Sequence, residues 1–366
     1  MAETSIEWTD KTWNPVVGCT RVSPGCEHCY AETMASRQVL MSVALGRRSP
    51  YLRVVDADNR RWTRAKDVKA DPANHQHVEL LPERLNEPLS FKPGTRVFVC
   101  SMSDLFHDAV PFEFIARVWA VMASRPNVIF QVLTKRAARM VEFLAWLEGQ
   151  AAAENYLPPG ACSHMWWGAG GAKGPAEWPM PLPNVWLGTS VEDQPRADER
   201  IPLLLAAPAA VRFLSAEPLL GPLDLGRWLG DYDCHSCGAR FWGREVRAVD
   251  RLVSVGSERD PSRPDDVEAE RDVCPRCGQP DLGTGDVGPV GGDYEGQPTI
   301  DWVIVGGESG PGARPMDPSW VRSLSTQCHI ADAAFFFKQW GGARKKQAGR
   351  ELDGRTHDAM PGVSHG

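Results

Sequence analysis

The chain has 366 residues and a formal net charge of −7 at pH 7, and 42% of its residues are hydrophobic. This length exceeds one average domain but fits a single α/β barrel with insertions, and the charge argues against a uniformly basic nucleic-acid binder. No apolar run approaches the roughly 20 residues of a membrane span, and the first residues lack the pattern of a secretory signal. The sequence therefore predicts a cytoplasmic protein without a membrane partner.

The N-terminal region contains three cysteines in a C-x6-C-x2-C run, Cys19, Cys26 and Cys29. A structural zinc site uses four protein ligands, whereas a [4Fe–4S] cube held by three cysteines leaves one iron open to a further ligand. The run therefore predicts a [4Fe–4S] cluster whose open iron binds S-adenosylmethionine (SAM), and the next residue, Tyr30, could lie beside the adenine. The alternative is a zinc knuckle completed by His28 or a distant group.

After the cysteines, the spacing of apolar residues predicts a helix from 31 to about 45. The residues that give this spacing are Met34, Val39, Leu40, Val43 and Ala44. Residues 51–93 are charged and contain several prolines, which predicts irregular structure with short helices. The basic residues in the first half of that segment are typical of a solvated connection, although they could also contact phosphate.

From residue 95 onward, short apolar runs alternate with stretches of helical periodicity. The runs are 97–100, 128–133, 185–187, 211–214, 302–305 and 334–337, and the helices are expected over 112–124, 136–150, 193–206 and 318–331. Together with a strand before the cysteines, they give about seven β-units. Continuous apolar strands alternating with helices predict a covered parallel sheet. The fold class is therefore α/β, a complete or partial TIM-type barrel.

Polar residues follow most of these apolar runs. They are Ser101, Asp104, Lys135, Ser190, Glu192, Glu217 and Glu308. Because the carboxyl ends of parallel strands meet at one edge of the sheet, here called the rim, these side chains are expected to form a site there. Any one of them could equally form a strand-end hydrogen bond or a helix cap, but their repetition favours a site.

Two insertions interrupt the alternation. Residues 155–183 are rich in Gly, Pro and Trp, and they predict either a lid over the rim or a surface loop. Residues 226–300 contain two C-x2-C-G motifs with an acidic loop between them. The four cysteines are Cys234, Cys237, Cys274 and Cys277. Two such motifs supply four thiolates for tetrahedral zinc, so the segment predicts an inserted zinc ribbon with a structural zinc ion.

The remaining segments complete the expected domain organisation. Residues 1–225 and 301–342 should form the barrel, and residues 343–366, which have little apolar content, a weakly ordered tail. Large apolar residues of the helices, such as Trp119 and Phe143, are expected to be core residues and not ligand contacts.

Several segments beyond the cysteines carry a family resemblance. They are Ile6-Glu-Trp-Thr-Asp-Lys-Thr-Trp-Asn-Pro, Ser101-Met-Ser-Asp-Leu-Phe-His, Leu133-Thr-Lys-Arg, Trp186-Leu-Gly-Thr-Ser-Val-Glu, Leu214-Ser-Ala-Glu-Pro-Leu, Gly306-Gly-Glu-Ser-Gly and Phe337-Lys-Gln-Trp-Gly. With the three-cysteine motif, they resemble an uncharacterised, largely phage-borne protein family related to radical SAM enzymes. The sequence departs from the commonest radical SAM spacing, C-x3-C-x2-C, by three extra residues between the first two cysteines.

The resemblance implies a barrel of the radical SAM kind, which modifies or repairs a nucleobase or nucleic acid with a 5′-deoxyadenosyl radical. It also implies that the rim binds SAM, with the following candidate contacts. The ribose hydroxyls or the methionyl ammonium would be bound by Ser101, Asp104, Ser190 and Glu192. A carboxylate or a phosphate would be bound by Lys135, and Glu217 is a further candidate contact. Glu308 lies in a Gly-Gly-Glu element that resembles the one that meets the SAM amine. An electron donor and, as in some relatives, a neighbour-encoded partner protein are also implied.

A non-enzymatic interpretation stays open. In it the N-terminal cysteines bind zinc and the rim contacts nucleic acid or a protein partner, so the chain is a zinc-stabilised binding module. If the chain is an enzyme, the alternative to a nucleobase or nucleic acid as substrate is a peptide or a small metabolite. Iron content separates the two interpretations, because only the enzyme requires an iron–sulfur cluster.

Overall fold

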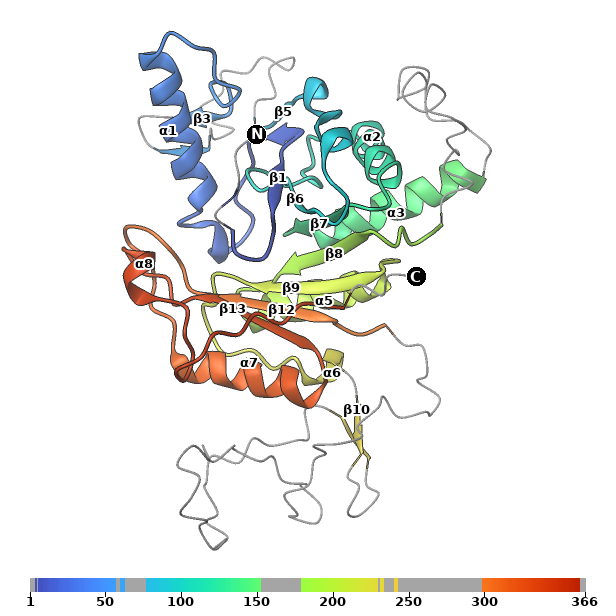
Figure 1. The fold of residues 1–366 in the computed structure, drawn as a ribbon, viewed down its shortest axis with the longest axis vertical. Helices are drawn as coiled ribbons and strands as arrows, with labels where there is room; N and C mark the ends of the chain where they lie inside the picture. The colour runs from blue at the N-terminus through green and yellow to red at the C-terminus, as the bar shows by residue number, and fades with distance from the viewer. Residues whose placement is uncertain are drawn as a thin grey trace, which may run out of the picture.

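The computed structural model describes residues 4, 6–56, 60–62, 77–152, 179–229, 231–233, 240–242 and 298–362. Within these ranges, seven strands form one parallel sheet (Figure 1). In order across the sheet they are β1 (Lys11–Trp13), β6 (Arg96–Val99), β7 (Ile129–Thr134), β8 (Val185–Ser190), β9 (Val211–Ala216), β12 (Trp302–Gly306) and β13 (Ala334–Gln339). Because spatial order equals chain order, each strand is added at the same edge, as in a TIM-type barrel.

The sheet curls into part of a barrel, since the strand direction rotates steadily from β1 to β13 (Figure 1). β1 and β13 are its edge strands in the described part of the chain, so strand pairing does not close the barrel there. The α/β class and the partial-barrel form predicted from the sequence are thus confirmed. The six apolar runs each lie within, or overlap, one of the strands that follow β1.

Four long helices connect the strands and cover one face of the sheet. They are α2 (Phe112–Ala123), α3 (Ala137–Ala152), α5 (Gln194–Ala206) and α7 (Pro318–Ile330). Each begins and ends within two residues of its predicted bounds. The carboxylates of Asp193 and Asp317 accept hydrogen bonds from the backbone N–H groups of Arg196 (3.1 Å) and Ser319 (2.8 Å), which fixes where α5 and α7 begin.

The main core lies between these helices and the sheet. Alternate strand residues such as Val97, Phe130 and Leu187 pack there against helix residues, which include the predicted core residues Trp119 and Phe143. The centroids of the rings of Trp119 and Phe143 lie 5.3 Å apart. Burial of large side chains on this face accounts for the strength of the apolar pattern in the sequence.

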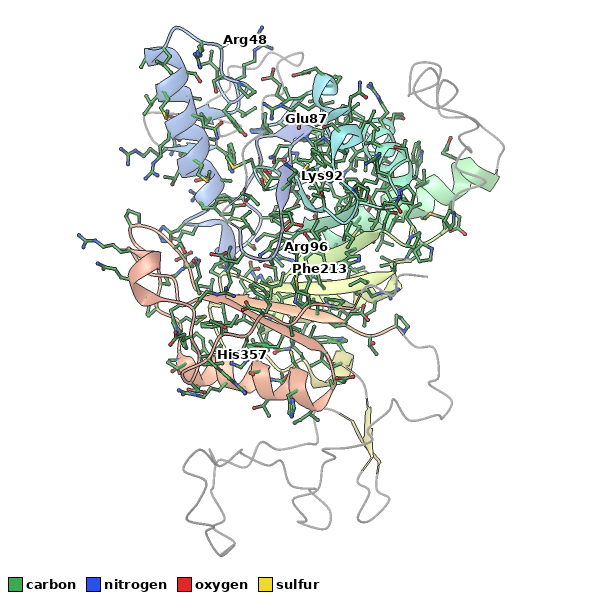
Figure 2. The ribbon with its side chains drawn as sticks, viewed as in Figure 1. Arg48, Glu87, Lys92, Arg96, Phe213 and His357 are labelled. Carbon is green, nitrogen blue, oxygen red and sulfur yellow. The ribbon has the colours of Figure 1, made fainter. Side chains whose placement is uncertain are left out.

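An aromatic cluster fills the opposite, concave face below the rim. Its buried members are Trp8, Phe98, Trp186, Phe213, Trp302, Ile304 and Phe336. A Cβ on Gly188 would lie 2.5 Å from the Phe213 ring, so only glycine leaves room for that ring (Figure 2 labels Phe213). The interior of the barrel is therefore packed, and the polar rim lies beyond this cluster.

The C-terminal tail differs from its expected weak order over residues 343–362. It contains α8 (Lys345–Ala348) and then returns to the sheet, where the carbonyl of His357 accepts from the backbone N–H of Phe337 (2.9 Å) (Figure 2 labels His357). The carbonyl of Ala359 accepts from the Trp302 indole (2.9 Å), and Leu352 is buried. Backbone hydrogen bonds and a few apolar anchors hold this segment, which its low apolar content did not reveal.

A smaller layer packs on α1 (Tyr30–Ala44) and contains β3 (Val55–Asp56) and β4 (Arg61–Trp62). The other short elements near the N-terminal part of the chain are β2 (Val16–Val17), η1 (Pro24–Cys26), β5 (Glu79–Leu80), η2 (Pro82–Arg84) and η3 (Glu87–Ser90), of which η3 contacts α2. The helix predicted here is confirmed, but of its apolar residues Val39 is buried whereas Met34, Leu40 and Val43 are exposed. Small residues such as Ala31 and Ala35 form the packed face instead.

The insertion after β9 is described only at its start. It includes α6 (Gly226–Leu229) and an antiparallel hairpin of β10 (Asp231–Asp233) and β11 (Arg240–Trp242). Most of the loop 155–183 and all four cysteines of the predicted zinc ribbon, Cys234, Cys237, Cys274 and Cys277, lie outside the described residues. Among the helices that the structure describes, none has the length and apolarity to cross a membrane.

Candidate functional site

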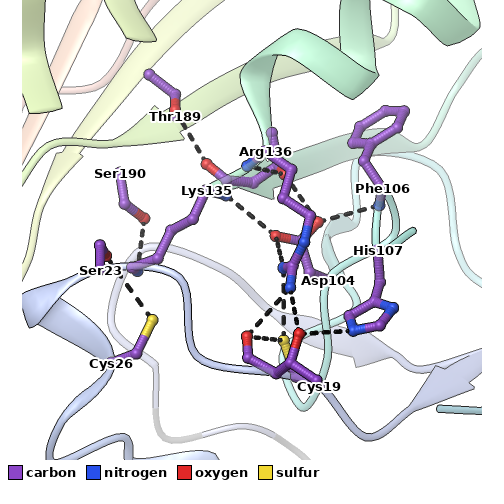
Figure 3. Close-up of polar contacts among 12 residues, drawn as sticks. Cys19, Ser23, Cys26, Asp104, Phe106, His107, Lys135, Arg136, Thr189 and Ser190 are labelled. Carbon is purple, nitrogen blue, oxygen red and sulfur yellow. Dashed lines mark hydrogen bonds and ion pairs between the residues drawn. The ribbon is translucent and has the colours of Figure 1, made fainter. Parts of the chain in front are cut away.

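The cysteine loop, residues 18–29, lies at the carboxyl ends of the central strands, between β2 and α1 (Figure 3). It begins at Gly18, which has φ +88° and forms a parallel bridge with Ser103 after β6. A Cβ at Gly18 would lie 2.3 Å from the carbonyl oxygen of His77, so the loop requires glycine at this point. Cys19, Cys26 and Cys29 are free and half-buried. The predicted rim residues follow β6, β7, β8, β9 and β12 and therefore share this end of the sheet.

Glu192 anchors the loop from the end of β8. Its carboxylate is fully buried, and it accepts from the backbone N–H of Gly25 (3.3 Å) and from Arg200 of α5 (3.1 Å). A Cβ on Gly25 would lie 3.0 Å from the Glu192 carboxyl carbon, so this approach also depends on glycine. Burial opposes ionisation, but the charges of Lys135 and Arg200 and the bond from Gly25 lower the pKa of Glu192 below its usual value. The carboxylate is thus an ionised internal clamp.

A second clamp reaches the loop from the end of β12. Both carboxylate oxygens of Glu308 accept hydrogen bonds from the Arg314 guanidinium, and the bond from Nε is 2.9 Å long. Burial opposes ionisation of Glu308, but the bonds from Arg314 outweigh it and lower the pKa of this carboxyl. Arg314 also donates to the Pro24 carbonyl (2.9 Å) and to the Glu27 carboxylate (3.1 Å). Glu308 therefore fixes the position of Arg314, which in turn holds the cysteine loop through hydrogen bonds.

The Gly-Gly-Glu element itself is shaped by close backbone packing. A Cβ at Gly307 would lie 2.0 Å from the Trp340 carbonyl oxygen, and one at Gly341 would lie 2.2 Å from the Glu308 carbonyl oxygen. The backbone N–H of Gly342 donates to that same Glu308 carbonyl (2.7 Å). The glycines after β12 and β13 thus let two loops pack together and present Glu308.

Asp104, after β6, has its carboxylate oxygens engaged within the protein. Oδ1 accepts from the Thr134 hydroxyl (2.7 Å) and the Phe106 N–H (3.0 Å), and Oδ2 accepts from the Lys135 N–H (3.1 Å) and Arg136 Nη1 (3.2 Å) (Figure 3). This carboxylate fastens the ends of β6 and β7 together. Its predicted contact with SAM stays a prediction, and in the structure its contacts are to the chain.

Arg136 joins this carboxylate to the cysteine loop. Its Nη1 lies 3.7 Å from Cys19 Sγ, and its Nη2 donates to the carbonyl (3.1 Å) and hydroxyl (2.8 Å) of Thr20. The side chain is buried, and so is its partner Asp104. Burial raises the pKa of Cys19 to about 12; the Asp104 charge adds to that shift and the Arg136 charge opposes it. A cation is therefore placed directly against one predicted cluster ligand.

His107 completes this side of the loop as a neutral group. Its Nδ1 accepts from the backbone N–H of Ala109 (3.1 Å), which assigns the ring proton to Nε2, 2.9 Å from the Thr20 hydroxyl. Burial, together with the charge of Arg136, lowers the pKa of His107 to about 4. The ring is consequently uncharged at neutral pH and serves as a hydrogen-bond donor to the loop.

Lys135 and Ser190, two of the predicted rim residues, contact each other in the structure. Lys135 Nζ donates to the Ser190 hydroxyl at 3.0 Å (Figure 3). Burial raises the pKa of Cys29, and the positive charge of Lys135 offsets part of this shift. Farther along the rim, Glu217 accepts two bonds of 2.8 Å from Lys338 of β13. Lysines thus stand on both halves of the rim.

Tyr30 occupies the first turn of α1. Its hydroxyl donates to the Ser101 carbonyl (2.5 Å), and the Ser101 hydroxyl donates to the Asn14 side chain (3.2 Å). Tyr30 as a whole is exposed, but desolvation of its hydroxyl, which is bonded to the Ser101 carbonyl, raises the pKa of that group, so it remains protonated at neutral pH. The two predicted residues are therefore neighbours, with their polar groups in contact with the chain.

The residues that sequence reasoning missed are mainly cations that hold the loop. Arg136 directly follows Lys135 in a quoted motif, which was the available signal, whereas Arg200 and Arg314 lie in a helix and in a connection whose sequences carry no such signal. Across the described ranges, no three His, Cys, Asp or Glu side chains converge closely enough to hold a single metal ion.

The bonds from Arg314 to the cysteine loop should limit how often the loop opens. Replacing Arg314 with alanine removes its bonds to Pro24, Glu27 and Glu308, and hydrogen bonds that involve a charged group are each worth about 1.5–3 kcal/mol. We expect the cysteines of Arg314→Ala to react with a disulfide reagent at least ~10-fold faster than those of the wild type, because the loop opens more often. The control is Arg322→Ala, which loses an exposed ion pair with Asp353. Equal rates of cysteine reaction in the two variants would show that Arg314 does not hold the loop.

Comparison with known proteins identifies the family to which the chain belongs. A family profile described as protein of unknown function (DUF5131) matches residues 3–361. Because the match spans nearly the whole chain, the protein belongs to this family. No curated protein and no solved structure matches it.

Proposed function

We propose that this member of the DUF5131 family is an iron–sulfur enzyme of the radical SAM kind. The observation that carries the proposal is a clamped loop with three free, half-buried cysteines at the carboxyl ends of a parallel partial barrel. Active sites of α/β barrels lie at this end of the strands. The charged rim supports the same location.

The donor set fits a [4Fe–4S] cluster. Thiolates are the usual protein ligands of such clusters, and three of them, Cys19, Cys26 and Cys29, would leave one iron for SAM. When bound and reduced, a cluster of this type supplies the electron that cleaves SAM into methionine and a 5′-deoxyadenosyl radical. The residues of the chain would hold the loop, exclude water from it and orient the cofactor.

The contacts divide the predicted rim residues into two groups. Asp104, Glu192 and Glu308 have their carboxylates engaged in holding the chain, so we assign them to positioning the loop. Lys135, whose bond is to a neutral hydroxyl, is the cation best suited to receive a carboxylate or a phosphate. Glu217 and the ring of Tyr30 are further candidates for contacts with SAM or the substrate.

A zinc ribbon in the insertion is the second part of the proposal. The hairpin of β10 and β11 is paired through Asp233 and Arg240, and Cys234 and Cys237 lie in the connection between these strands. A hairpin that leads into C-x2-C-G is the usual support of a zinc knuckle. With Cys274 and Cys277 it would form a structural site of four thiolates.

The substrate that we favour is a nucleobase or nucleic acid. The net charge is −7, and three rim cations, Arg136, Arg314 and Lys338, are paired with the carboxylates of Asp104, Glu308 and Glu217. Lys135, whose bond is to the Ser190 hydroxyl, is therefore the rim cation that we assign to a phosphate of the substrate. A one-electron donor would be an obligatory partner, and the place of action would be the cytoplasm, that of the host for a phage-borne gene.

The experiment compares substrate classes by their effect on SAM cleavage. Reconstituted, dithionite-reduced protein is incubated with SAM and with DNA, RNA, nucleosides or peptides. We expect DNA, RNA or a nucleoside to raise the formation of 5′-deoxyadenosine, with deuterium passing from labelled substrate into that product. Stimulation by peptides alone would contradict the substrate class, and stimulation by no candidate together with stable nucleic-acid binding would favour the binding module.

A further inference from the structure

The side chain of Arg136 stands between a cluster ligand and a buried carboxylate. Its Nη1 contacts both Cys19 Sγ (3.7 Å) and Asp104 Oδ2 (3.2 Å). Nη2 is held by the carbonyl and the hydroxyl of Thr20, and this hydroxyl is in turn bonded to neutral His107. The guanidinium therefore has a fixed position in a water-poor site, where charges act strongly.

Arg136 and Asp104 exert opposite electrostatic effects at the cysteine loop. Reduction of a cluster adds one negative charge, which a neighbouring cation stabilises and a neighbouring carboxylate destabilises. Hydrogen bonds to cluster sulfurs and burial are the established means by which proteins set cluster potentials. The guanidinium lies against Cys19 Sγ (3.7 Å), and the Asp104 carboxylate lies directly behind it (3.2 Å), so both charges are close to this sulfur.

We propose that Arg136 and Asp104 form a charge pair that sets the reduction potential of the cluster, with Arg136 raising it and Asp104 lowering it. The inference rests on the proposed [4Fe–4S] cluster and assigns its control to two residues that do not bind iron. Both are positioning residues, and the pair would fix how strong a reductant the electron donor must be.

The test is a four-member cycle of variants measured by anaerobic redox titration. Dithionite supplies one electron per oxidised cluster, and absorbance or electron paramagnetic resonance reports the midpoint. We expect Arg136→Gln to disfavour reduction by about tenfold, a shift of ~59 mV to lower potential for a one-electron couple, and Asp104→Asn to shift the midpoint upward. The double variant, in which both charges are absent, should return toward the wild-type value.

Two further variants separate charge from structure. Arg136→Lys keeps the cation and should retain most of the wild-type potential. Arg139→Gln removes an arginine in the first turn of α3, which donates to the Val110 carbonyl and lies over the Phe112 ring, and it should leave the midpoint unchanged. A merely structural role would shift Arg136→Gln and Asp104→Asn in the same direction or lower only their iron content.

The outcomes distinguish this inference from the proposed function. Equal midpoints in the wild type, Arg136→Gln and Asp104→Asn, each with a full cluster, would overturn the charge pair and leave the enzyme proposal intact. Failure of the wild type to assemble any cluster would overturn both. Opposite shifts in the two single variants would establish the inference.

Discussion

Replacement of any one of Cys19, Cys26 and Cys29 by alanine is expected to abolish the iron–sulfur cluster. After anaerobic reconstitution with iron and sulfide, the wild type should be brown and contain about four irons per chain. The loop 18–29 contains no fourth cysteine that could replace a lost thiolate ligand. Iron and sulfide analysis with visible absorption spectra measures the loss.

Two other cysteines provide the controls for this result. Cys328 is free and buried in α7, so Cys328→Ala should keep its colour and its iron. Cys234→Ala should also keep the cluster, and it should release zinc. If the wild type binds zinc in the N-terminal loop and takes up no iron, the binding-module interpretation becomes the better account.

Loss of the buried Glu192–Arg200 pair is expected to cause the largest loss of stability from a single charged residue. The two side chains are 0% and 4% exposed, and removal of one partner of a buried pair typically costs about 3–5 kcal/mol because it leaves an uncompensated charge. Glu192→Ala also removes the anchor of Gly25. We therefore expect a drop of about 3 kcal/mol or more in the free energy of unfolding, measured by urea denaturation.

The chain offers a matched, exposed pair for comparison. Asp198 and Arg227 are each about half exposed, so Asp198→Ala should cost less than about 1 kcal/mol. The double variant Glu192→Ala/Arg200→Met should recover part of the loss, because both buried charges are then absent. A Glu192→Ala protein as stable as Asp198→Ala would show that this clamp does not hold the loop.

Much of the fold could be predicted because its strands are buried on both faces. Runs such as 97–100 and 302–305 are continuously apolar for that reason, and the helical stretches between successive runs left few alternatives to a parallel sheet in chain order. The same logic placed Lys135 and Ser190 at one rim, since Lys135 follows β7 and Ser190 ends the neighbouring strand β8. A shared rim could be predicted because the carboxyl ends of parallel strands lie at the same edge of the sheet.

The clamps could not be predicted, because they join segments that are distant in the sequence. Arg200 belongs to a helix whose pattern indicates packing, and its approach to Glu192 depends on how α5 lies on the sheet. Arg314 is separated from Pro24 by 290 residues. Glu192 and Glu308 had suitable chemistry for a ligand, and only their tertiary contacts show that their oxygens are engaged by the chain.

Two local features could not be predicted from sequence patterns, for physical reasons. In α1 the apolar spacing predicted the helix but not its packed face, since the helix packs through small residues and exposes Met34 and Leu40. In the tail, low apolar content indicated weak order, whereas backbone hydrogen bonds to β13 and the buried Leu352 hold the segment. Hydrogen bonding between distant backbone segments leaves no compositional signal.

The most direct test of the central claim is whether the loaded cysteine loop cleaves SAM. Reconstituted protein is reduced with dithionite under anaerobic conditions and incubated with SAM, and 5′-deoxyadenosine and methionine are quantified by chromatography, with Cys26→Ala as the control. The account predicts slow formation of both products by the wild type, even without substrate, and none by Cys26→Ala. A wild type that carries a full, reduced cluster and binds SAM yet leaves it intact would contradict the account.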